Sequence, residues 1–133
     1  TSALWTWFKA IGDWIKQLSP TGATKYDTGW TTLTTVSAAT GGTCVIRRYG
    51  KVVQLQINGV TVSVSATGTT AIVETIPTEF LPANRTVRGV AVLTAGNASG
   101  TLALTSAGGL AIFNNTGTAK TAINSGTMTW IVD

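Results

Sequence analysis

The spacing of apolar residues changes from helical to strand-like at the Ser19-Pro20-Thr21-Gly22 segment. Before this segment, apolar side chains recur every three or four residues, whereas after it they recur at every second residue. A proline and a glycine just past the last periodic residue end a helix and turn the chain. The sequence therefore predicts two parts, an N-terminal helix with its turn over residues 1–22 and a β-domain over residues 23–133.

Residues 3–18 have the apolar spacing of a coiled coil, with alternating steps of four and three residues. Isoleucine at both kinds of seam position favours three or more helices over two. Four of the ten aromatic residues lie in this stretch, and soluble monomers rarely expose so large an apolar patch. We therefore expect a short amphipathic helix that associates with two or more further copies of itself. The interface, that of a trimer in the smallest case, consists of Leu4, Phe8, Ile11, Ile15 and Leu18, flanked by Trp7 and Trp14.

Two other positions for this helix remain open from the residues alone. The helix would bury the same stripe if it packed against its own β-domain. It would also bury the stripe on a membrane surface, but a polar face with only Lys9, Lys16 and Asp13 is weakly charged for that role. No window resembles a signal peptide or an apolar span of 18 residues, so no membrane partner is expected.

The rest of the chain reads as short strands separated by glycine, asparagine and threonine turns. Alternating runs at 52–57 and 60–65 flank Asn58-Gly59, a pair that favours a two-residue hairpin turn. The sequence thus predicts a hairpin there and further strands at 30–36, 44–49, 72–76, 86–94, 101–105, 110–113 and 127–132. Eight or nine such strands indicate an all-β fold, an antiparallel barrel or sandwich.

Groups suited to catalysis are scarce. The chain has no histidine and one cysteine, Cys44, which we expect to be a small core residue. The nearest pair of carboxylates after the helix, Glu74 and Glu79, is separated by Pro77, so a shared strand face is not expected. The sequence therefore predicts a protein that is not an enzyme and uses no metal or cofactor.

The net charge of +4 comes from nine basic and five acidic residues scattered along the chain, so no nucleic-acid partner is expected. A neutral surface rich in hydroxyl and amide groups with occasional aromatic rings suits sugar ligands. Five residues at loop or strand-end positions are candidates for contacting a saccharide, and they are Trp30, Tyr49, Arg88, Asn97 and Asn114.

One segment carries a resemblance to a known family. Ile76-Pro-Thr-Glu-Phe-Leu-Pro-Ala-Asn-Arg85, followed by an alternating strand, resembles a segment of receptor-binding proteins of phages infecting Gram-positive lactic bacteria, especially the lactococcal baseplate type. The likeness continues through Thr105-Ser-Ala-Gly108 and Ile112-Phe113 to Gly126-Thr127 and the end of the chain. Tyr26-Asp-Thr-Gly-Trp30 also resembles the start of many phage tail-fibre tips.

The resemblance implies a trimeric β-barrel head that binds host cell-wall saccharides, an N-terminal helical part that docks onto a baseplate protein, and a place in the virion at the tail tip. Relatives often carry Trp, His and Asp in the strand before the Thr105 loop, where this chain has Asn97, Thr101 and Ala103. The family's binding residues therefore do not carry over. An alternative is a structural or accessory baseplate or tail-fibre subunit that contacts other virion proteins.

Overall fold

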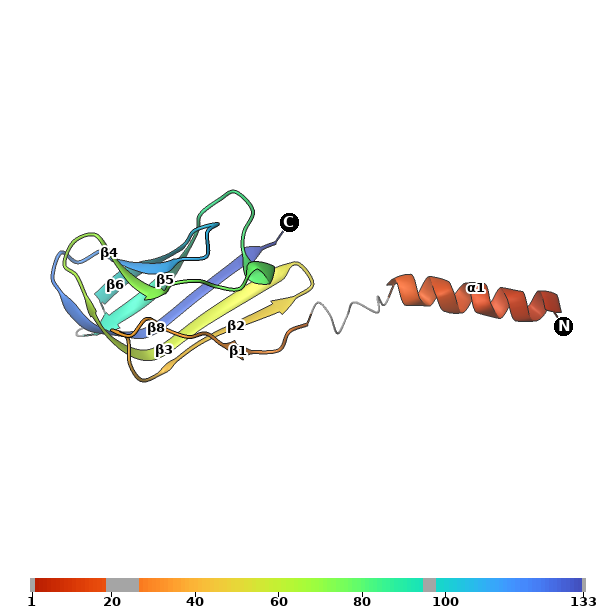
Figure 1. The fold of residues 1–133 in the computed structure, drawn as a ribbon, viewed down its shortest axis with the longest axis horizontal. Helices are drawn as coiled ribbons and strands as arrows, with labels where there is room; N and C mark the ends of the chain where they lie inside the picture. Colours follow the sequence, from red (N-terminus) through yellow and green to blue (C-terminus); the bar gives the residue numbers. More distant parts are fainter. Residues whose placement is uncertain (1, 19–26, 95–97, 133) are drawn as a thin grey trace.

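The computed structural model describes residues 2–18, 27–94 and 98–132. The helix predicted at the N-terminus is present, and strands dominate the described residues after it (Figure 1). The elements are α1 (Ser2–Leu18), β1 (Thr31–Thr32), β2 (Thr43–Tyr49), β3 (Val52–Val64), β4 (Thr69–Val73), the 3-10 turn η1 (Thr78–Phe80), β5 (Val87–Thr94), β6 (Ala98–Leu104), β7 (Leu110–Asn114) and β8 (Lys120–Ile131).

The strands of the described residues form one antiparallel sheet in the order β1-β2-β3-β8-β5-β6-β7-β4. The sheet curls so that its two edges approach each other. The Val36 amide, four residues after β1, donates a hydrogen bond to the Ile72 carbonyl of β4 at 2.8 Å. Figure 1 shows the resulting curled sheet, with β4 lying opposite β3 and β8. The predicted all-β, barrel-like fold is confirmed.

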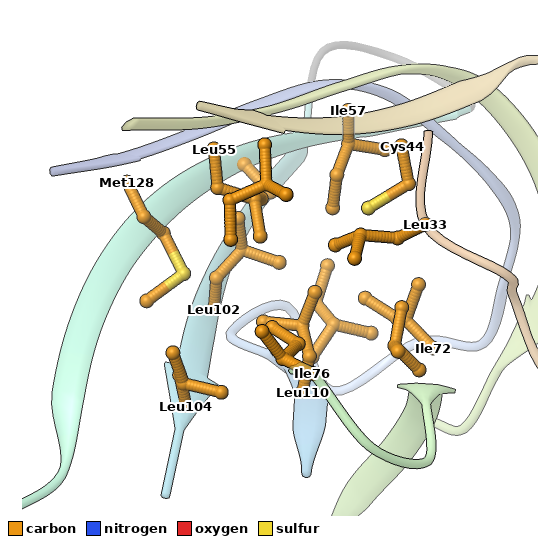
Figure 2. Close-up of a cluster of buried hydrophobic side chains, with 14 of the residues drawn as sticks. Leu33, Cys44, Leu55, Ile57, Ile72, Ile76, Leu102, Leu104, Leu110 and Met128 are labelled. Atoms are coloured by element: carbon orange, nitrogen blue, oxygen red, sulfur yellow. The ribbon is translucent and has the colours of Figure 1, made fainter. Parts of the chain in front are cut away.

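One apolar cluster fills the inside of the curled sheet. Figure 2 shows Leu55 and Ile57 of β3 facing Ile72, Ile76 and Leu110 from the opposite wall. Alternation along each strand produces this cluster, because every second side chain points inward. The predicted inward faces of β3 and β8 are confirmed, as is the buried position of Cys44, which is 1% exposed.

The hairpin predicted at Asn58-Gly59 is wrong. β3 runs without interruption from Val52 to Val64, pairing with β2 over its first half and with β8 along most of its length. A type I′ turn needs positive φ at both central residues, but only Gly59 has it, at 62°. The prediction failed because the C-terminal strand, distant in sequence, supplies the partner that a hairpin would have supplied locally.

Gly59 instead shifts the inward face of the strand by one residue. Ile57 and Val60 are both buried, whereas the two residues between them are exposed. The segment of the same chain just before β2 approaches closely here, since a Cβ on Gly42 would lie 2.2 Å from the Asn58 carbonyl oxygen. The Asn-Gly pair therefore marks an irregularity inside a long strand, which is the other structure that an isolated strand glycine indicates.

Two strand lengths also differ from the prediction. β8 begins at Lys120 rather than at residue 127, and its first half pairs with both β3 and β5. The short hydroxyl-rich run from 120 to 126 lacks apolar alternation, so it gave no strand signal. The strand predicted at 30–36 is reduced to Thr31–Thr32, since the chain then leaves β2 and crosses toward β4.

The first half of α1 presents its apolar residues to solvent in the single chain. Leu4, Trp7 and Phe8 are each more than half exposed, and the rings of Trp7 and Phe8 meet edge to face with centroids 5.2 Å apart. Ile11 is partly exposed. The side chains of Trp14, Ile15 and Leu18, and the predicted domain boundary at residue 22, lie outside what the structure describes.

Candidate functional site

The outer face of the curled sheet carries neutral side chains in rows that cross the strands. One row is formed by residues that are direct cross-strand partners over the whole width of the sheet, and it consists of Thr32, Val45, Gln56, Thr127, Val90, Thr101, Phe113 and Thr69. Val90 is 68% and Phe113 is 43% exposed. This face is therefore a mixture of hydroxyl, amide and apolar groups.

At one end of this face lies a cluster of five residues that we call the Tyr49 corner, and four of them line a hollow. Tyr49 and Arg47 point outward from β2, and their cross-strand partners Val52 and Gln54 point outward from β3. Arg47, Tyr49, Val52 and Gln54 line a hollow of about 320 Å³. Asp27 completes the corner through a bridge that its backbone makes with Tyr49.

An ion pair fixes the polar side of the Tyr49 corner. The Arg47 guanidinium donates to both Asp27 carboxylate oxygens, from Nε at 3.2 Å and from Nη2 at 3.0 Å. It also lies 5.9 Å from the centre of the Tyr49 ring, in a cation–π arrangement. Because a two-pronged contact sets the plane of the guanidinium, its remaining N–H groups have defined directions.

The Arg47 hydrogen bond, followed by the backbone N–H of Gly29, lowers the pKa of the Asp27 carboxyl below its usual value. Asp27 is therefore ionised at neutral pH and cancels the charge of Arg47. The Tyr49 corner thus offers hydrogen-bond donors, acceptors and an aromatic ring that is 67% exposed, without net charge. Such a set can bind a neutral polyhydroxylated ring, which stacks on an aromatic face and exchanges hydrogen bonds at its edge.

Two of the five predicted saccharide-contacting residues lie at this end of the sheet. Tyr49 belongs to the corner itself. Trp30 is 45% exposed and directly precedes Thr31, which pairs with Ile46 beside Arg47. The sequence reasoning missed Asp27, Arg47 and Gln54, although Arg47 and Tyr49 stand at alternate positions of one strand, a spacing that puts them on one face.

The other predicted residues do not join the corner. Arg88 is exposed on β5, which β8 and β3 separate from β2. Asn97 lies outside the described residues. Asn114 is 3% exposed, and its amide nitrogen donates to the carbonyls of Ser65 and Thr118 while its oxygen accepts from Thr116. Asn114 therefore holds the turn after β7 together and has no group available to a ligand.

In the described part of the chain, no three His, Cys, Asp or Glu side chains gather closely enough to hold a metal ion. Another hollow lies between the segments that follow β1 and β4. It is lined by Thr34, Thr35, Val36, Ser37, Glu74 and Thr75, and none of these residues carries an aromatic ring. No helix among residues 2–18, 27–94 and 98–132 has both the length and the apolar content needed to cross a membrane.

Comparison with known proteins identifies the fold. No protein-family model matches the chain, and no curated protein matches it. Among solved structures, the chain is similar to the head domain of phage bIL170, whose crystal structure was described under the question of a common fold for the receptor-binding domains of lactococcal phages. The two are 21% identical with a TM-score of 0.61, over 79% of this chain and 98% of that chain. The resemblance noted in the sequence is thus confirmed for the fold.

Proposed function

We propose that this chain, which has the fold of a lactococcal phage receptor-binding head domain, is itself a phage receptor-binding protein. In this proposal its β-domain binds saccharides of the host cell wall without catalysis. The chain acts as a homotrimer in the virion, at the tail tip or baseplate, and α1 connects it to a baseplate protein.

The Tyr49 corner is the observation that supports saccharide binding most directly. An exposed aromatic ring stands beside a neutral ion pair and the Gln54 amide in one hollow. Sugars present apolar C–H faces and polar edges, and these groups match the ring and the hydrogen-bonding side chains. The chain has no histidine, and among the described residues the corner holds one carboxylate. It therefore suits recognition better than hydrolysis, which needs two carboxyl groups across the bond.

The exposed apolar residues in the first half of α1 support a trimer. Leu4 and Phe8 follow the seam spacing and are 57% and 56% exposed in the single chain. Burying them against two further copies would remove this apolar surface from water. Three heads on one tip would also bind a repetitive wall polymer with higher avidity than one head, because each bound site raises the effective concentration of the others.

Binding to host wall polysaccharide tests the function. We expect the intact chain to bind a polysaccharide extract of a susceptible lactic bacterium, and Tyr49→Ala to weaken the binding at least tenfold. The matched control is Phe113→Ala, which also removes an exposed aromatic ring but lies at the far side of the same face. This variant should retain binding. Absence of binding to wall extracts and to a glycan array would refute the proposal.

Light scattering tests the trimer. The intact chain should have three times the mass of one chain, and Phe8→Asp should give monomers because it places a charge in the seam. A chain beginning at Thr24 shows whether the β-domain assembles without the helix. A particle of 13.7 kDa for the intact chain would exclude the trimer.

A second candidate function is an accessory baseplate subunit that binds other virion proteins. The 72% exposure of Trp5, outside the predicted seam, favours it, since a trimer would leave that indole for another partner. This function predicts that Trp5→Ala abolishes co-purification with a baseplate protein of the same phage. It also predicts no saccharide affinity, so the wall-extract titration separates the two functions.

A further inference from the structure

A trough separate from the Tyr49 corner crosses the middle of the outer face. Its floor is β8, where the side chains of Ser125 and Thr127 are small. One wall is formed by Gln56 and Asn58 of β3 and the other by Val90 and Val92 of β5. The registers align these residues as two rows of three, Gln56-Thr127-Val90 and Asn58-Ser125-Val92.

The dimensions of the trough suit a small ring. Neighbouring strands lie about 4.8 Å apart, so the two walls stand roughly 10 Å apart, and the two rows are separated by about 7 Å along the strands. The trough has a volume of about 330 Å³. That volume is at the lower end of the range of about 300–1,000 Å³ typical of ligand sites.

The two walls differ in chemistry. Gln56 and Asn58 supply amide donors and acceptors, and Ser125 and Thr127 add hydroxyl groups. Among the described residues, these four side chains make no hydrogen bond to another part of the protein. Val90 and Val92, which are 68% and 37% exposed, form an apolar surface opposite them.

Within the described part of the chain, no charged side chain lines the trough. An anionic group, such as a phosphate or a uronic acid, would find no cation there, and a basic group would find no carboxylate. A neutral pyranose fits both walls, because its C–H face can contact the valines while its hydroxyl edge exchanges hydrogen bonds with the amides.

We infer that the trough formed by Gln56, Asn58, Val90, Val92, Ser125 and Thr127 binds one neutral sugar ring of the wall saccharide. The inference rests on the proposed function and adds a second subsite to it. Gln54 of the corner and Gln56 of the trough stand two residues apart on β3, about 7 Å. A single oligosaccharide chain can therefore lie along β3 and occupy both hollows, with its neutral ring in the trough.

Nuclear magnetic resonance of the intact, isotope-labelled protein tests this subsite. The probes are D-glucose, D-galactose, N-acetyl-D-glucosamine and L-rhamnose, each titrated to high millimolar concentration. With at least one probe we expect shifts of the side-chain amide signals of Gln56 and Asn58 and of the backbone amide of Thr127.

Thr127→Tyr fills the trough with a ring and should weaken that binding at least tenfold. The matched control is Thr121→Tyr, an exposed position on the same strand roughly 20 Å away, which should bind like the unaltered chain. Thermal unfolding of both variants verifies that each is folded. If Thr127→Tyr does not fold, Thr127→Val serves instead, because it removes one hydroxyl at constant size and should weaken binding measurably.

The outcomes separate this inference from the proposed function. Shifts confined to the Tyr49 corner, or no shift with any probe, overturn the trough subsite, while wall-extract binding continues to test the function independently. Shifts in the trough without wall-extract binding support a sugar subsite and refute the host-receptor role. If Thr127→Tyr loses the trimer and no probe shifts the signals of the unaltered protein, another copy of the chain covers the trough. That result overturns the inference.

Discussion

The indole Nε1 of Trp130 donates a hydrogen bond to the carbonyl oxygen of Phe80 at 2.7 Å inside the β-domain. Trp130 belongs to β8 and is 4% exposed, whereas Phe80 ends η1 and is 1% exposed. The bond joins the segment that carries the family resemblance, residues 76–85, to the last strand. That segment therefore packs its Phe80 ring into the core and is tied to β8.

Replacing Trp130 with phenylalanine should lower the free energy of unfolding by about 1–3 kcal/mol, because the buried Phe80 carbonyl loses its donor. Urea unfolding followed by circular dichroism measures the change. Trp30→Phe, at an exposed position, is the control and should change stability by less than about 0.5 kcal/mol. Equal losses in both variants would contradict the structural role of the bond.

Single substitutions at Asn58 and Gly59 distinguish the continuous strand from the hairpin. Gly59→Ala should destabilise the protein by about 1–2 kcal/mol, the cost of placing a Cβ in the left-handed region. Asn58→Ala should cost less than about 0.5 kcal/mol, since its backbone is ordinary strand and its side chain is exposed. In a type I′ turn both substitutions would destabilise, and chemical denaturation separates these outcomes.

The Asp27–Arg47 pair should make the stability of the folded protein depend on pH in the acidic range. The pKa of Asp27 is lowered in the folded protein, so the folded state holds this proton less tightly than the unfolded state does. The stabilisation is therefore fully present above the ordinary value of 3.8 and is lost as the pH falls below it through the lowered pKa.

Asp27→Asn should remove this acid-dependent part and flatten the stability curve below that value, as thermal unfolding over a series of pH values will show. Because the pair is partly exposed, added salt should reduce the effect. The control Glu79→Gln keeps the pair intact and should retain its acid dependence.

Cys44 should resist thiol reagents in the folded protein. Burial raises the pKa of its thiol to about 12, which keeps it protonated at neutral and mildly alkaline pH. Ellman's reagent should therefore react only as the protein unfolds. Ser63→Cys adds a thiol at an exposed position of β3 and should react at once, so prompt reaction of Cys44 itself would contradict its burial.

Local sequence patterns predicted which residues form a helix or strands better than they predicted which strands pair with each other. Val53, Leu55 and Ile57 point inward as their alternation predicted. The helix α1 ends at Leu18, as the apolar spacing predicted, and begins one residue before the predicted start. Asn58-Gly59 misled because a hairpin and a long strand containing a glycine with positive φ give the same local pattern. The first half of β8 was missed because it owes its conformation to β3 and β5 on either side rather than to its own residues.

The candidate site shows the same division. Tyr49 and Trp30 were predicted as exposed aromatic residues, but their neighbours come from pairings between segments about twenty residues apart, such as Asp27 with Arg47. Asn114 has a side chain of the kind that binds sugars, and only the folded turn shows that its amide is already hydrogen-bonded within the protein.

The amino-acid sequence by itself determined a helix with an apolar stripe, a domain of short strands and a surface poor in charge, because periodicity and composition act over a few neighbouring residues. The tertiary structure alone decided the strand order, the single strand through Gly59 and the meeting of Asp27, Arg47 and Tyr49. These depend on which distant strands pair, and pairing is set by the burial of one shared core rather than by any local preference.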